Sequence, residues 1–185
     1  MKHALLYVFG LIVIGSLGAA TPAAADSVGP YYATPSWDQQ LPASTRFIVL
    51  SNWIDASFPS GGAAVLDRET GLVWERSPST LQVNWSHAHI QCVFNSRGNR
   101  FGWRVPTLEE LASLIDPTVF PASPTLPAGH PFQHVQPSDY WSATDFGTAS
   151  VAYVADFADG GVSDIAKTSN AYVWCVRGGQ GVNPQ

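Results

Sequence analysis

The sequence contains little cysteine, and its two cysteines, Cys92 and Cys175, lie far apart along the 185 residues. No Cys-x-x-Cys motif occurs and neither cysteine has an adjacent basic residue, so nothing indicates an activated thiol. A single pair of cysteines in an exported chain is typical of one structural disulfide. We therefore predict a Cys92–Cys175 disulfide, and a pair of reactive thiols is the alternative.

Charged residues are also scarce, at 12% of the chain, and 9 Lys and Arg stand against 14 Asp and Glu. The formal net charge of −5 provides no general attraction to nucleic acid or to an anionic membrane surface. We therefore predict no nucleic-acid partner. Seven Trp are spread along the chain, which suits a compact domain better than a solvated polyelectrolyte.

Motifs of catalysis are missing from the sequence. There is no HExxH zinc motif, no glycine-rich phosphate loop, and no Ser, His and Asp with the surroundings of a catalytic triad. Three carboxylates, Asp139, Asp145 and Asp156, could meet for hydrolysis, but scattered acids of this kind are common. We predict a non-catalytic protein without a cofactor.

The N-terminal segment contains a hydrophobic run from Ala4 to about Ala20. This run is shorter than the roughly 20 residues that a membrane-spanning helix needs. Lys2 precedes it and Ala23–Ala25 follow it, which is the pattern of a secretory signal peptide with its cleavage site. We predict a signal peptide over residues 1–25, a periplasmic or secreted product, and no stable membrane insertion after cleavage. An uncleaved membrane anchor is the alternative.

The rest of the chain divides into an irregular lead-in over residues 26–60, a single domain over residues 61–180 and a tail over residues 181–185. Within the lead-in, the β-prone run Arg46–Leu50 predicts an edge strand. The division therefore places one folded unit between two irregular ends.

The first half of this domain predicts a hairpin followed by a helix. Ala63–Leu66 and Leu72–Trp74 are apolar runs on either side of a polar loop that ends in glycine, which is typical of a β-hairpin. Asn84 can cap a helix over Trp85–Arg97, and the glycine that follows can end it. The helical spacing places Cys92 on the buried face of this helix.

A strand then turns directly into a second helix. Phe101–Val105 alternates like a strand, and Pro106 ends it because proline has no backbone N–H to donate. Thr107 can cap the helix, since Glu110 stands three residues later and completes a capping box. Apolar residues at helical spacing follow this cap. We therefore predict that this turn from strand to helix anchors the fold.

The last third of the chain has strand composition. Four strands are predicted, over Tyr140–Thr144, Ser150–Phe157, Val162–Ile165 and Ala171–Arg177. Before them, residues 118–138 contain five prolines and form a long loop without regular structure. A loop of this length in a compact domain is more often functional than accidental. We predict that it is a solvent-facing recognition loop.

Candidate binding residues come from this loop and from a basic run. His130, His134 and Asp139 could ligate zinc, but no second cluster supplies the remaining ligands, so we predict no metal site. The arginines that precede the second helix could bind sulfate or carboxylate groups. We expect Arg104 to form a structural ion pair instead, and Tyr140 to expose its ring for stacking on sugars. The predicted binding residues are Arg97, Arg100, His130, His134, Asp139 and Tyr140.

Five groups of motifs occur in a specific order. They are Leu66-Asp67 with Thr70–Trp74, then Trp85 with Cys92, then Gly102–Thr107 with Glu110-Leu111, then Tyr140–Ser142, and last Cys175–Gly179. In these motifs the chain resembles the Lcl C-terminal domain family, a bacterial domain named for the tip of a collagen-like adhesin. Val73 and Val105 depart from its pattern, where Met and Leu are common. The structural motif residues are Trp74, Trp85, Trp103, Arg104, Pro106, Thr107, Glu110, Trp141 and Arg177.

The resemblance implies an α+β domain related to the C-type lectin-like fold, with two helices, short antiparallel sheets and a long irregular loop. In that fold a disulfide joins the first helix to the last strand, in agreement with our prediction for Cys92 and Cys175. The acid-amide tripeptides of the lectin calcium site are missing from this sequence.

The resemblance also implies an adhesin-like function, namely an exported, non-catalytic module that binds a polysaccharide or a cell-surface partner. The alternative is a periplasmic enzyme, because formylglycine-generating enzymes share the wider fold. Those enzymes need a reactive cysteine pair, so free thiols would favour this alternative. The oligomeric state is not indicated by the sequence.

Overall fold

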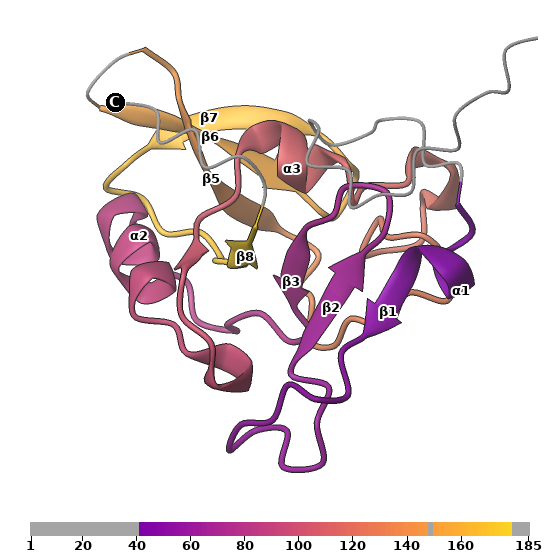
Figure 1. The fold of residues 1–185 in the computed structure, drawn as a ribbon. Coiled ribbons are helices and arrows are strands. Elements are labelled where there is room, and N and C mark those ends of the chain that lie inside the picture. The colour runs from indigo at the N-terminus through magenta and orange to yellow at the C-terminus, as the bar shows by residue number, and fades with distance from the viewer. Residues whose placement is uncertain (1–40, 148–149, 179–185) are drawn as a thin grey trace, which may run out of the picture.

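The computed structural model describes residues 41–147 and 150–178 (Figure 1). The predicted signal peptide, the first part of the lead-in and the C-terminal tail lie outside these residues. No helix in the described part combines the length and apolar composition needed to cross a bilayer. The helices are α1 (Ala43–Arg46), α2 (Trp85–Val93) and α3 (Leu108–Ala112), with short 3-10 turns η1 (Arg97–Asn99) and η2 (Pro117–Val119). The strands are β1 (Phe47–Val49), β2 (Ala64–Asp67), β3 (Val73–Glu75), β4 (Trp103–Arg104), β5 (Asp139–Asp145), β6 (Val151–Asp156), β7 (Val162–Ala166) and β8 (Val176–Arg177).

One sheet has five antiparallel strands in the order β1-β2-β3-β8-β4. Its hairpin, β2–β3, is the predicted one, and Asp67 N donates to Leu72 O across the turn at 2.8 Å. Gly71 in this turn has a φ of 70°, which glycine adopts without steric cost. The predicted edge strand over Arg46–Leu50 is confirmed as β1 at its three middle residues, whereas Arg46 ends α1, a helix that was not predicted. Since β8 lies between β3 and β4, the last described strand along the chain connects these two strands within the sheet.

The second sheet is a three-stranded antiparallel meander, β5-β6-β7. Figure 1 shows α3 beside this sheet, where it contacts β5 and β6, while α2 contacts β4 and β5. The predicted final strand over Ala171–Arg177 is too long, because only Val176–Arg177 forms β8. Ala171 bridges to Val83 and Tyr172 to Tyr140, so this segment passes from one sheet to the other and cannot follow a single ladder.

The predicted disulfide is confirmed. Cys92 on α2 and Cys175, just before β8, are bonded, with their Cα atoms 5.4 Å apart and both side chains buried. Trp74, Trp141 and Trp174 are fully buried in the core between the two sheets and the helices. The observed α+β architecture with antiparallel sheets therefore agrees with the prediction, and its relation to lectin-like folds stays a prediction.

The helix starts follow the predicted caps. Asn84 Oδ1 accepts from His87 N at 3.0 Å. Thr107 Oγ1 accepts from Glu110 N at 3.3 Å, while Glu110 Oε2 accepts from Thr107 N at 2.8 Å. Each cap satisfies backbone N–H groups that have no partner inside the helix. The predicted first residues of α2 and α3 are therefore confirmed.

The first predicted helix is too long at its C-terminal end. It ends at Val93 rather than Arg97, and Asn95 Oδ1 accepts from Arg97 N at 2.9 Å. Such a local side-chain bond competes with helical hydrogen bonding. Gly98 follows with a φ of 62°, and a Cβ there would lie 2.7 Å from the Trp53 Cβ. The turn therefore requires glycine at this position.

The proline-rich loop is less exposed than predicted. Leu126 and Phe132 are buried, and the Phe132 ring lies 4.9 Å from the Trp174 ring and 5.1 Å from the Phe47 ring. Gln133 N also donates to Arg76 O at 2.8 Å. The middle of the loop is thus part of the core, and the prediction of a solvent-facing recognition loop is wrong for it.

Candidate binding groove

Tyr140 does not expose its ring for stacking on sugars. Its side chain is fully buried, its ring packs against Phe157 and Trp174, and its hydroxyl accepts from Gln136 N at 2.8 Å. Burial raises the pKa of this phenol far above its ordinary value. The prediction of an exposed stacking ring is wrong here, because Tyr140 points into the core from β5.

Arg104 forms the structural ion pair that was predicted. Its two terminal nitrogens lie 2.6 Å from the two carboxylate oxygens of Glu110, and Nη2 also donates to Gly178 O at 2.8 Å. The bidentate pair joins β4 to α3, and the bond to Gly178 joins β4 to the residue that follows β8. Its guanidinium is therefore engaged within the fold.

The histidines of the proline-rich loop have local partners. His130 stacks on Phe132 with ring centroids 5.9 Å apart, and burial lowers its pKa. His134 Nδ1 lies 3.0 Å from Ser77 Oγ. Burial, followed by the charges of Asp156 and Asp159, raises the pKa of Asp139. Among the residues that the structure describes, no three His, Cys, Asp or Glu side chains form a group that could hold a metal ion.

Arg97 lies at a surface groove that the sequence did not reveal. The groove has a volume of about 480 Å³ and lies between the loop around Asp55 and the end of α2. Its lining is predominantly polar and carries side-chain amides, hydroxyls, two carboxylates and one guanidinium. The lining residues are Asp55, Ala56, Ser57, Glu75, Gln91, Phe94, Asn95, Ser96, Arg97 and Asn99.

Charges inside the groove are arranged around Arg97. Its Nη1 donates to Ser57 Oγ at 2.9 Å, its Nε lies 3.5 Å from Glu75 Oε1, and Nη1 lies 3.9 Å from Asp55 Oδ2. Asp55 in turn accepts from the backbone N–H of Ser57 and of Gly98. These contacts hold the two walls of the groove together.

Glu75 connects the groove to the interior. It is only 5% exposed, its Oε1 accepts from Asn95 Nδ2 at 2.7 Å, and its Oε2 accepts from Cys175 N at 2.9 Å. The segment just before β8, which carries Cys175, is thereby hydrogen bonded to the groove. Burial raises the pKa of Glu75, while the bonds from Cys175, Asn95 and Arg97 partly oppose this shift.

A pH-dependent prediction follows for Glu75. Because its native pKa is raised above 4.5, the folded protein keeps a proton on Glu75 in a pH range where the unfolded chain has lost it. The free energy of unfolding therefore decreases as the pH rises from about 4.5 through the native pKa. We expect Glu75→Gln to remove this part of the pH dependence, as measured by urea unfolding across this range. Glu109→Gln, on the exposed face of α3, should retain it because Glu75 is intact. Identical profiles for wild type and Glu75→Gln would contradict the prediction.

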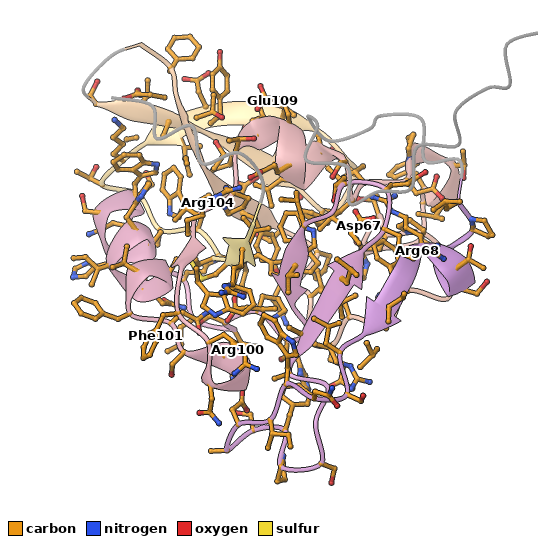
Figure 2. The ribbon with its side chains drawn as sticks, in the orientation of Figure 1. Asp67, Arg68, Arg100, Phe101, Arg104 and Glu109 are labelled. Carbon is orange, nitrogen blue, oxygen red and sulfur yellow. A yellow bond between two sulfur atoms is a disulfide. The ribbon has the colours of Figure 1, made fainter. Side chains whose placement is uncertain are left out.

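Exposed aromatic rings border the groove and the turn after it. Phe94, in the groove lining, is 78% exposed, and Phe101 is 72% exposed. Figure 2 shows Phe101 and Arg100 together below α2. Arg100 and Arg177 place their guanidinium carbons 5.6 and 5.5 Å from the Trp53 ring centroid. Of the predicted binding residues, the structure therefore places only Arg97 in the groove, with Arg100 nearby.

The comparisons with known proteins agree with the motifs. No curated protein matches the chain. The Lcl C-terminal domain matches residues 63–177, which is more than half of the sequence. Glu75 and the groove wall at residues 91–99 fall inside this match, whereas Asp55 and Ser57 precede it. The predicted resemblance is confirmed, and the chain belongs to the Lcl C-terminal domain family.

Proposed function

We propose that this chain is an exported, non-catalytic module that binds a polysaccharide in the groove beside α2. The observation that carries the proposal is a hollow lined by amide and hydroxyl side chains, with the exposed ring of Phe94 at its wall. Membership of the Lcl C-terminal domain family is consistent with an exported binding module. A protein on a cell surface is the other partner that the family suggests.

The polar lining suits a ligand rich in hydroxyl groups. Gln91 carries an amide, which has both a donor and an acceptor group, and Ser96 carries a hydroxyl. Asn95, Asn99 and Ser57 add polar atoms that already take part in hydrogen bonds within the protein. Sugar hydroxyls also donate and accept, so one hydroxyl can meet two such groups. A concave site with a few convergent polar groups is the usual form of a small-ligand site.

The exposed aromatic rings suit the apolar C–H face of a sugar ring. A pyranose has a face of C–H groups that packs against an aromatic ring, and such contacts supply affinity without catalysis. Phe94 and Phe101 expose rings of this kind at the groove and just after it.

The disulfide supports a binding function over the enzymatic alternative. Both cysteines of the chain are in the Cys92–Cys175 bond, so no thiol is left for chemistry of the formylglycine-generating type. A structural disulfide also fits an oxidising compartment, in line with a periplasmic or secreted location. These points support a module that binds its ligand without converting it.

Phe94 provides the direct test. A glycan array with the chain from residue 26 onward, with and without a chelator, identifies a ligand. We then expect Phe94→Ala to weaken binding at least tenfold, about 1.4 kcal/mol, because the stacking surface is lost. Isothermal titration calorimetry measures this affinity.

The matched control is Leu81→Ala, since Leu81 is 71% exposed and lies outside the groove lining. Both variants should unfold within about 0.5 kcal/mol of the wild type, because exposed side chains contribute little to stability. Equal affinity of Phe94→Ala and Leu81→Ala would place the binding site elsewhere. An array without any bound glycan would contradict the proposed function itself.

A further inference from the structure

We infer that the groove accepts an uncharged, hydroxyl-rich sugar unit and discriminates against the corresponding uronic acid. This inference rests on the proposed function and specifies the ligand class of the same site. It follows from the balance of charges in the groove and from the positions of the arginines.

Carboxylates outnumber cations in the lining. Asp55 and Glu75 line the groove together with one guanidinium, that of Arg97. Arg97 is already engaged, through Nε near Glu75 and Nη1 near Asp55 and Ser57. An incoming carboxylate would have to displace these contacts. It would also lie close to the Asp55 carboxylate and, above the raised native pKa of Glu75, to a second like charge, and like charges across a contact disfavour binding.

The other arginines do not supply the missing positive charge. Arg104 is paired with Glu110 on α3. Arg100 lies over Trp53 and is not part of the groove lining. The net charge of −5 for the whole chain adds a long-range repulsion of polyanions. Asn95, Asn99 and Ser57 already hydrogen bond within the protein. The groups left to meet a ligand in the groove are therefore the Gln91 amide, the Ser96 hydroxyl and the Phe94 ring.

Matched pairs of oligosaccharides test the inference. Mannohexaose and the mannuronic acid hexasaccharide with the same linkage differ only at C6, which is the carbon of a hydroxymethyl group in one and of a carboxylate in the other. Cellohexaose with the β-1,4-linked glucuronic acid hexasaccharide provides a second such pair. With the chain from residue 26 onward, we expect the neutral member of at least one pair to bind at least tenfold more tightly by calorimetry.

Charge variants locate the discrimination in the groove. At mildly alkaline pH, Glu75→Gln removes one carboxylate from the lining and should reduce the preference at least threefold by strengthening binding of the acidic member. Asp55→Asn should act in the same direction and serves where Glu75→Gln folds poorly. The control, Glu109→Gln, makes the same charge change on α3, away from Arg100 and Phe101 in Figure 2, and should leave the preference unchanged.

Each result decides the matter. Tighter or equal binding of the acidic members overturns the inference, as does an equal effect of Glu75→Gln and Glu109→Gln, which would indicate a general charge effect. Binding of no member also overturns it. The proposed function is tested separately. It fails when the array shows no glycan whose binding is weakened by Phe94→Ala.

Discussion

Replacing Cys92 and Cys175 together with alanine is expected to lower the free energy of unfolding by about 4–5 kcal/mol. The bond closes a loop across a sequence separation of 83 residues, so its loss greatly increases the conformational entropy of the unfolded chain. For a domain of this size the melting temperature should fall by roughly 10–20 °C. Guanidinium unfolding followed by tryptophan fluorescence measures the change.

The control for this prediction is the wild-type chain unfolded in the presence of a reductant. It loses the bond but keeps both sulfur atoms, so the difference between it and the double variant reports the cavity left by two alanines. A double variant that unfolds at the wild-type denaturant concentration would show that the bridge contributes no stability. Loss of the bridge should also change ligand binding in the groove, because Cys175 N donates to Glu75 in the groove lining.

Arg46→Met is expected to destabilise the protein by about 3–5 kcal/mol, because it leaves buried carboxylates without their cation. Arg46 is fully buried, and its Nη2 lies 2.8 Å from Asp67 Oδ2 while its Nε lies 3.0 Å from Glu69 Oε2. Nη2 also donates to Ser113 O at 2.8 Å. One side chain thus joins α1, the β2–β3 turn and the end of α3.

Asp145→Asn is the matched control for Arg46→Met. It disrupts the ion pair between Asp145 and Lys167, in which the Asp145 side chain is 45% exposed. A pair that water reaches in this way contributes about 1 kcal/mol or less. Urea unfolding of the two variants should therefore differ by at least about 2 kcal/mol. Equal costs would mean that the Arg46 network is not the anchor that its contacts indicate.

Local structure was the part of this fold most accessible to sequence reasoning. The capping box of Thr107 and Glu110, the hairpin around Gly71 and the cap at Asn84 depend on residues within a few positions of one another. Their hydrogen bonds join residues that are close in the sequence, so the residue types that form them can be recognised there. The Cys92–Cys175 bond was also predictable, since a single pair leaves one intramolecular connection.

Burial was the part that sequence reasoning missed. Tyr140 and Phe132 are aromatic, as are Phe94 and Phe101, yet the first two are buried and the last two exposed. Composition does not distinguish them, because exposure depends on which distant segments pack against each ring. The groove was missed for the same reason, since its walls come from residues 55–57, residue 75 and residues 91–99.

The sequence by itself determined where the helices and the hairpin begin, which cysteines bond and which family the chain belongs to, because these depend on neighbouring residues or on motifs in order. Only the tertiary structure decided that Arg97 faces two carboxylates and that Glu75 lies beneath a polar groove. The hydrogen bonds of Glu75 join residues up to 100 positions apart, and the energy of a charge depends on its surroundings in space rather than on its neighbours in the chain.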